Sequence, residues 1–294
     1  KLENKKVKIF NDHFEETLTD IPHLKFLEFE EEDLDRKSNQ IEVNGSDGVL
    51  QGPMNFGPFN LILRFSYKGT DYKEYRLAKE KLRQLINRRD PYFVWHSDMP
   101  GKKYAVIPEG VSNENLTSQF GLIEVTYSVY KGYAESLKDT SEFSWTDESC
   151  QFEQGIIGSD EVKYKHNIRY FKIFNGSKDT INPLLRHKLN INCTLTAPYG
   201  FEIVNLTTND IFQYKKPLKK RNTVSIIGVH PYINNKRVGK DTNYDFITLA
   251  PGWNEILIRG HNISNSPKTE FIFKNIYSYV RILENLIFIN KQGT

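Results

Sequence analysis

The sequence predicts an α+β domain followed by an all-β domain. One amphipathic helical segment at 71–90 lies between strand-like runs in the first half, and the stretch after residue 132 becomes polar and loses its periodicity. Beyond it, short runs alternate at period two with no helical period between them. The 294 residues suffice for two domains that each bury a core. We therefore expect a first domain at 1–132, a linker at 133–148, a second domain at 149–278 and an extension of unclear role at 279–294.

Alternating apolar residues mark the strands of the first domain. Val7–Phe10 predicts a short opening strand, and the Asn, Gly and Asp residues of 40–53 are typical of a turn between two strands. The clearest strand is 59–67, followed after the helix by two shorter runs and a long one at 120–130. The acidic run "FLEFEEEDLDR" (26–36) predicts a solvated loop or an edge strand, with an interaction face as the alternative.

The helical segment shows apolar residues at steps of three and four. Its stripe consists of Tyr75, Ala78, Leu82 and Leu85, and its opposite face is strongly charged. Asp71 with Glu74 resembles a capping box, and Pro91 ends the helix. We expect this helix to lay its stripe on the core and its charged face in solvent.

The second half predicts a sandwich of two sheets, because its short alternating runs are separated by turns about every ten residues. The stretch "DFITLAPGWNEILIRG" (245–260) predicts a hairpin. Pro251 and Gly252 fit the two central positions of a type II turn. Trp253, just past the corner, either packs over the end of the sandwich or is exposed for contact.

No enzymatic signature is present, so we expect no catalytic residue, no cofactor and no metal site. The seven histidines never fall at metal-ligand spacing, and neither a nucleophile elbow nor a phosphate-binding glycine loop occurs. A pair of carboxylates that meets only in the fold, as in a glycosidase, stays open. Cys150 and Cys193 are too few for a disulfide framework, and we expect both to be reduced.

The charge balance indicates neither nucleic acid nor membrane as a partner. The 40 basic and 37 acidic residues nearly cancel, and no run of about 18 apolar residues exists. One basic run stands out, "QYKKPLKKR" (213–221). It is either a surface for an anionic partner or a solvated turn that protects a sheet edge. Lys215, Lys216 and Trp253 are therefore the candidate partner contacts.

The order and spacing of these elements resemble the distal tail proteins of long-tailed, non-contractile phages, especially phages of Gram-positive hosts such as staphylococci. The first half carries a turn like "VNGSDGV", a strand like "LILRFSYKGTDY", the helix "YRLAKEKLRQLI" and the strand "GLIEVTYSVYKGY". The second half carries "NDIFQYKKPLKKRNTVSII" and a Leu-x-Pro-Gly-x-Asn segment formed by Leu249, Pro251, Gly252 and Asn254. The resemblance extends from about residue 5 to residue 278.

The resemblance implies a structural virion protein of the tail tip or baseplate, made in the host cytoplasm. Its fold would be an α+β N-terminal belt domain, with sandwich-like strands and one crossing helix, followed by an all-β galectin-like sandwich. In this family six belt domains close into a ring that continues the tail tube. We expect a homo-hexamer whose partners are the tail tube protein, the tail-associated tip protein and receptor-binding or baseplate proteins, with DNA only in transit.

The galectin-like part of the resemblance raises an alternative, a carbohydrate-binding module for host cell-wall glycans. Galectin sites use a His-x-Asn-x-Arg strand with a tryptophan downstream. Here "HNIR" (166–169) lacks that spacing, and Trp253 follows a turn. Because a fold does not confer its relatives' ligand, a sugar site would need polar side chains that converge on the ring.

Overall fold

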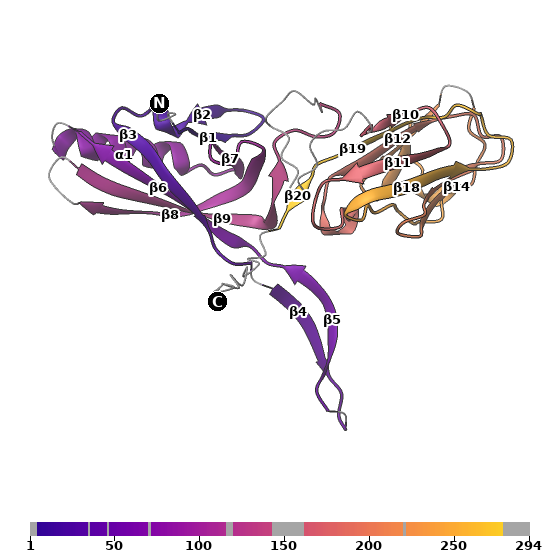
Figure 1. Cartoon of the computed structure of the whole chain (residues 1–294), viewed down its shortest axis with the longest axis horizontal. Coiled ribbons are helices and arrows are strands. Elements are labelled where there is room, and N and C mark those ends of the chain that lie inside the picture. Colours follow the sequence, from indigo (N-terminus) through magenta and orange to yellow (C-terminus); the bar gives the residue numbers. More distant parts are fainter. Residues whose placement is uncertain are drawn as a thin grey trace, which may run out of the picture.

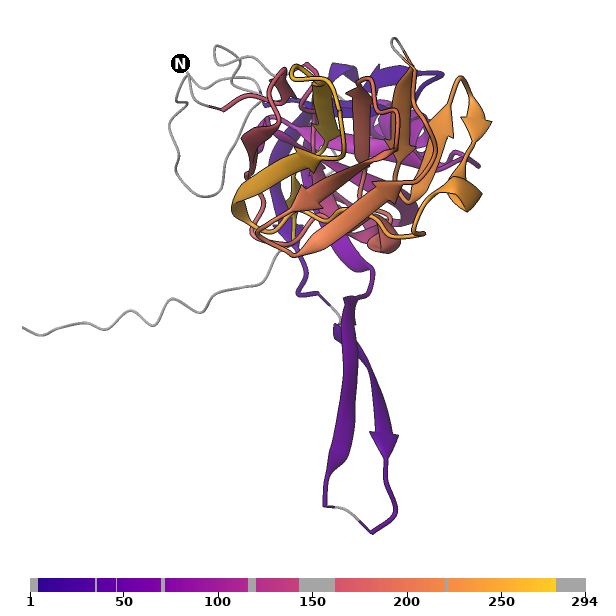
Figure 2. The ribbon, with the colours of Figure 1, turned by 90° about the vertical axis from the view of Figure 1, so that its right-hand side faces the viewer.

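The computed structural model describes residues 5–34, 36–45, 47–69, 72–115, 120–142, 162–219 and 222–278. It shows two lobes side by side along the long axis of the molecule, with a two-stranded hairpin that projects from the region between them (Figure 1). Seen along that axis, the hairpin stands well clear of both lobes (Figure 2).

The first lobe is one curved, mainly antiparallel sheet with a single helix. The strand order is β2-β1-β7-β8-β9-β6-β3, and β20 pairs with β9 outside this path. The elements are β1 (Val7–Phe10), β2 (Glu15–Thr17), η1 (Leu18–Asp20), β3 (Leu24–Glu31), β6 (Phe59–Lys68), α1 (Tyr72–Ile86), β7 (Tyr92–His96), β8 (Lys102–Asn115), β9 (Phe120–Ser136) and β20 (Ile276–Tyr277).

The core of this lobe follows from the alternation in its two central strands. In β6 every second side chain from Phe59 to Tyr67 is buried, and β9 buries its own alternate residues directly opposite. Tyr75, Ala78 and Leu82 of α1 join the same cluster, which confirms the predicted stripe, with Ile86 as a further member and Leu85 half-buried. The predicted α+β first domain is thus present, whereas Asp71 of the capping box lies outside the described residues.

The acidic run forms β3, at one edge of this sheet. Its outward carboxylates Glu28 and Glu30 pair with Arg64 of β6, at 3.0 and 2.6 Å, and the same guanidinium contacts Glu124 of β9 at 3.0 Å. The edge-strand interpretation is therefore confirmed. Charged side chains along an exposed edge oppose non-specific pairing with another strand.

The second lobe consists of two sheets around one core. The larger has the order β10-β19-β12-β15-β16-β17 and the smaller β11-β18-β13-β14. The elements are β10 (Lys165–His166), β11 (Tyr170–Asn175), η2 (Pro183–Leu185), β12 (Leu189–Thr194), β13 (Phe201–Asn205), β14 (Asp210–Tyr214), β15 (Thr223–Ile227), β16 (His230–Ile233), β17 (Lys236–Arg237), η3 (Gly239–Asp241), β18 (Gly252–Arg259) and β19 (Lys268–Phe273). Inward side chains of both sheets form one buried cluster, as in a sandwich.

The predicted hairpin at 245–260 is wrong in its first half. Only Gly252–Arg259 forms a strand, β18, and its partners are β11 and β13. The preceding residues are instead held by one isolated backbone bridge between Leu249 and Ile181 and by side chains. Asp210 accepts from the Thr248 backbone at 2.8 Å, and Asn254 exchanges two bonds of 2.8 Å with the backbone of Ala250. Gly252 does adopt the positive φ of 82° expected for the turn.

The boundary between the lobes also differs from the prediction. β9 continues to Ser136, so 133–136, assigned to the linker, are strand, because β20 from the far end of the chain pairs with Ala134 and Glu135. The following residues are held on the second lobe: Thr140 Oγ1 donates to the Phe271 carbonyl at 2.8 Å. The rest of the predicted linker, 143–148, and the predicted extension, 279–294, lie outside the described residues.

Candidate functional site

The projecting hairpin is the most exposed part of the described chain. β4 (Arg36–Glu42) and β5 (Val49–Phe56) pair only with each other and form a sheet of their own. Gly45 and Gly48 adopt positive φ angles of 85° and 78° in the turn, as its Asn-Gly and Asp-Gly sequence predicts. An isolated two-stranded hairpin has marginal stability in water, so this length of pairing needs support from outside.

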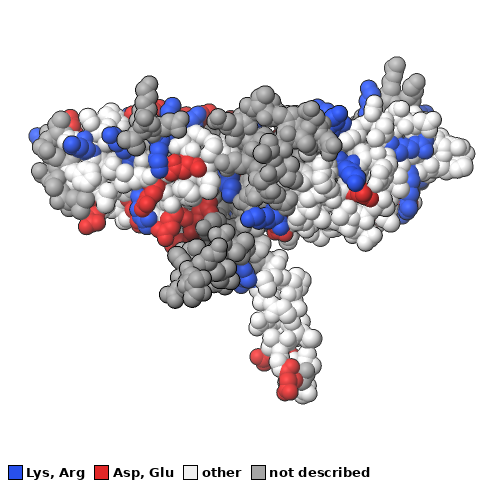
Figure 3. Space-filling view, viewed as in Figure 1, with Lys and Arg blue, Asp and Glu red and all other residues white. Residues whose placement is uncertain are grey.

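The hairpin exposes apolar side chains on both faces. Ile41 is 62% and Leu50 63% exposed, and they lie opposite each other on one face. Met54 and Phe56 pair with Ser38 and Arg36 on the other face, because the bulge between Ser38 and Gln40 shifts the register of β5. Figure 3 shows a largely uncharged shaft with acidic atoms near the tip. Exposed apolar surface of this kind marks an interaction site.

A pocket of about 260 Å³ lies at the base of the hairpin, where both lobes meet it. Phe56 of the hairpin, Lys131 and Tyr133 of β9 and His187 of the second lobe line it. The Tyr133 ring meets His187 edge-on at 4.9 Å, and burial lowers the pKa of His187. Beside it Gly132 has a φ of 72° and leaves no room for a Cβ, which would lie 2.7 Å from the Gly57 carbonyl oxygen. This glycine lets β9 turn closely beneath the hairpin.

The candidates predicted from the sequence lie at opposite ends of the smaller sheet of the second lobe. Trp253 is the second residue of β18, is 38% exposed, and packs on Phe174 of β11 with a distance of 5.1 Å between the ring centres. Lys215 and Lys216 follow β14 and are both exposed. Tyr214, the last residue of β14, pairs with Phe201 at the other end of the sheet. This position lies roughly 20 Å from Trp253 along the strands. Trp253 thus combines packing with partial exposure, and it does not share a site with the two lysines.

The described residues show no built site for chemistry at these positions. No three His, Cys, Asp or Glu side chains among them gather in a way that could hold a metal ion. Cys193 is a buried thiol, and burial raises its pKa to about 12 despite a contact with the Thr269 hydroxyl. Cys150 lies outside the described residues. None of the helices in the described ranges has the length and hydrophobicity needed to cross a membrane.

A family comparison accounts for the first lobe. Residues 8–127 match the family described as the phage tail protein RIFT-related domain. The first lobe is therefore similar to this phage tail family over residues 8–127. The resemblance to siphophage distal tail proteins predicted from the sequence is thus confirmed. No curated protein sequence matches the chain.

Comparison with solved structures extends the likeness to both lobes. The Dit protein of phage SPP1, described as a paradigm of the hub adsorption apparatus in phages that infect Gram-positive bacteria, matches with a TM-score of 0.62 and 14% identity. The match covers 91% of this chain and 98% of that one, so the two share a fold. Two phage P2 baseplate structures, with Ca and with Sr, match at 9% and 10% identity over 94% of this chain and 99% of theirs. Their TM-scores of 0.38 and 0.37 are too low to add to the argument.

Sequence reasoning missed that the hairpin projects from the rest of the chain. It predicted a turn between short strands, yet the structure places both strands away from either core. The available signal was the apolar character of both faces near an Asn-Gly turn. Such a pattern is unusual for a surface hairpin, which normally has one polar face.

Proposed function

We propose that this chain is a distal tail protein of a phage, six copies of which form a ring at the tip of the tail. The ring would join the tail tube to the tail-associated tip protein and to baseplate or receptor-binding proteins. DNA would pass through its lumen without being held. The projecting apolar hairpin carries this proposal, and the match of residues 8–127 to a phage tail family supports it.

A ring of identical chains requires two different surfaces on each chain that fit one another after a rotation that closes. The hairpin is a suitable first surface, because it extends beyond its own lobes and exposes Ile41 and Leu50. Its insertion against a neighbouring copy would remove those side chains from water. Each such apolar side chain contributes on the order of 1.5–3 kcal/mol when it becomes fully buried.

The second lobe is proposed as a galectin-like sandwich that points away from the ring axis and holds other baseplate parts. The opposite positions of Trp253 and of Lys215 with Lys216 favour two separate contacts on this lobe. A solvent-exposed lysine pair suits an acidic partner surface, and a half-exposed indole suits an apolar pocket. The carbohydrate-binding alternative stays a prediction, since polar side chains converging on Trp253 would be needed for it.

The test compares the mass of the full-length chain in solution with that of a hairpin variant. Native mass spectrometry of the unmodified protein should show a particle of about six times the 34.3 kDa chain mass. The double variant Ile41→Ser with Leu50→Ser should shift this population to single chains. Both side chains are exposed on a sheet separate from the two cores, so the lobes should keep their fold.

The matched control is Ile227→Ser on β15 of the second lobe, where an isoleucine is 51% exposed away from the hairpin. This variant should assemble like the unmodified chain. A hairpin variant that still forms hexamers would contradict the assigned role of the hairpin. A stable dimer that never forms rings would contradict the distal tail assignment itself.

A further inference from the structure

Three lysines gather around one phenylalanine ring where the two lobes meet. Their ammonium nitrogens lie 4.1, 5.8 and 6.0 Å from the centre of the Phe93 ring, in the order Lys103, Lys131 and Lys274. We call these three residues the junction lysine cluster. Lys103 comes from β8 and Lys131 from β9 of the first lobe, whereas Lys274 follows β19 of the second. Cation–π contacts draw ammonium groups to such a ring but leave the cations close together.

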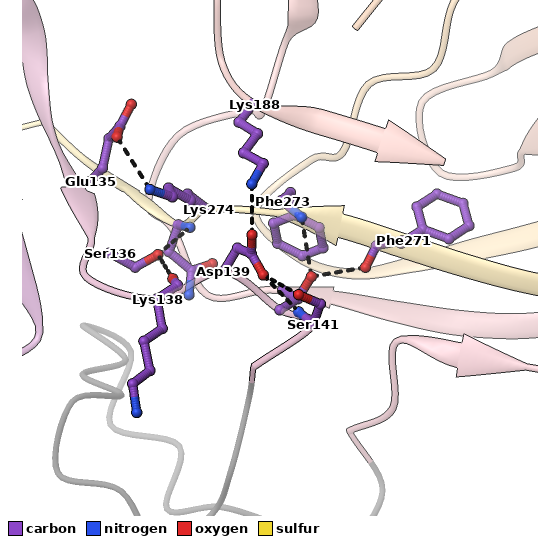
Figure 4. A network of polar contacts seen from close by, with 11 residues as sticks. Glu135, Ser136, Lys138, Asp139, Ser141, Lys188, Phe271, Phe273 and Lys274 are labelled. Atoms are coloured by element: carbon purple, nitrogen blue, oxygen red, sulfur yellow. Dashed lines mark hydrogen bonds and ion pairs between the residues drawn. The ribbon is translucent and has the colours of Figure 1, made fainter. Parts of the chain in front are cut away.

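The junction lysine cluster is largely buried, yet it contains less negative than positive charge. Glu135, itself 5% exposed, is the carboxylate among the described residues that contacts it, at 2.5 Å from Lys131 and 3.8 Å from Lys274 (Figure 4). Burial alone would raise the pKa of Glu135, but the ammonium of Lys131, followed by Lys274, holds it below its ordinary value. One carboxylate thus faces three cations.

Lys103 is the unbalanced member. It is 6% exposed, and no ion pair with a carboxylate is found for it within the described ranges. Its contacts are the rings of Phe93 and Phe10 and the amine of Lys274, which lies within hydrogen-bonding reach. When both amines are protonated they offer donors only, so neither then satisfies the other. A buried ammonium without an acceptor is costly.

We propose that the junction lysine cluster binds an oxyanion, held between the amines of Lys103 and Lys274. An oxyanion would supply the missing acceptor to both amines and offset the excess positive charge. Because the two lysines belong to different lobes, the bound anion would also link them. The anion is a free phosphate-type ion or the carboxylate of another protein chain, and the two sources share this chemistry.

The protonation of Lys103 supports the same site. Burial, reinforced by the nearby amine of Lys274, lowers the pKa of Lys103 to about 7, while Glu135 opposes this shift and Lys131 adds to it. Near pH 7 a large share of Lys103 is therefore neutral. An anion favours the protonated amine, so its binding should be accompanied by uptake of a proton by the protein.

The test titrates inorganic phosphate into the full-length protein at pH 7 by calorimetry, at constant ionic strength. We expect one saturable site per chain, with an apparent heat that varies with the ionisation heat of the buffer because a proton is taken up. Lys103→Met should weaken phosphate binding at least about tenfold and remove the buffer dependence. The control Lys172→Met alters an exposed lysine that pairs with Glu255 at 3.2 Å on the second lobe. It should change neither the affinity for phosphate nor the dependence of the heat on the buffer.

A second variant keeps the test decisive if Lys103→Met does not fold. Glu135→Gln removes the competing carboxylate and should tighten phosphate binding by about threefold or more. Acetate then separates the sources: binding of phosphate but not acetate indicates a free phosphate-type ion, and comparable binding of both indicates a site for protein carboxylates. Absence of saturable binding by either probe, or phosphate binding unchanged in Lys103→Met, would overturn the proposal.

Discussion

A buried histidine in the first lobe leads to a quantitative prediction about the pH dependence of stability. His96 ends β7 with 0% exposure, and its ring lies 4.2 Å from the Phe29 ring and stacks on Tyr104 at 5.7 Å. Neither ring nitrogen has a hydrogen-bond partner. Burial lowers the pKa of His96 from 6.5 to about 4, with Asp98 acting weakly in the opposite direction. The imidazole is therefore held neutral inside an aromatic cluster.

The direction of the pH effect follows from proton binding in the two states. Between pH 6.5 and about 4 the unfolded chain protonates His96 and the folded chain does not, so acid favours unfolding. The stability is fully present above pH 6.5 and is lost as the pH falls toward 4. A pKa difference of this size corresponds to about 3 kcal/mol over the whole window, of which about 2 kcal/mol is lost by pH 5.

The variant His96→Phe tests this value. Phenylalanine keeps the ring contacts and cannot be protonated, and no hydrogen bond is lost by the replacement. We expect urea unfolding of the first domain to give similar stabilities for both proteins at pH 8. At pH 5 the variant should be more stable by about 2 kcal/mol. His13→Phe, at an exposed loop position, is the control and should follow the unmodified chain. Equal pH dependence of the unmodified chain and His96→Phe would refute the reasoning.

Two further substitutions test backbone support in each lobe. Asn254→Ala removes an amide that is fully buried and also accepts from Asn205 at 3.1 Å, and should lower the free energy of unfolding of the second lobe by about 3 kcal/mol in urea titrations. A loss below about 1 kcal/mol would show that the backbone finds other partners. Gly132→Ala combines a positive φ with a clash against Gly57 and should lower the thermal midpoint of the first lobe by several degrees, roughly 2 kcal/mol or more. Gly110→Ala has open space around its Cβ and should leave the midpoint nearly unchanged, so equal effects of the two would contradict the steric argument.

Local periodicity predicted most of the first lobe. The alternation in β6 and the three- and four-residue steps in α1 are intrinsic to each segment, and burial follows them closely. The order of the segments along the chain also indicated two lobes, because the helical pattern occurs only before the polar stretch that follows residue 132. Strand alternation and helical periodicity are set by residues close together in the chain, so both can be identified from one sequence.

The failures occurred where side-chain hydrogen bonds and an isolated bridge take the place of a continuous backbone ladder. Residues 245–250 alternate like a strand, but Thr248 is bonded by Asp210 and Ala250 by Asn254, so the segment follows those side chains rather than a ladder. The junction lysine cluster is a stronger case, since Lys103 and Lys274 meet only because β20 returns to β9. No pattern within either segment indicates that contact.

The hairpin shows why the proposed assembly surface is difficult to predict from alternation alone. Alternation identifies a strand by contrast between a buried and a solvated face, and here Ile41 and Leu50 lie on one face while Met54 and Phe56 lie on the other. A partner that covered one face would still leave apolar side chains of the second face in water. A hairpin of this composition is best stabilised by enclosure from both sides, as between two neighbouring chains of a ring. The apolar side chains on both faces of the hairpin weaken the alternation by which a strand is identified in the sequence. The same side chains would suit the hairpin to the proposed assembly.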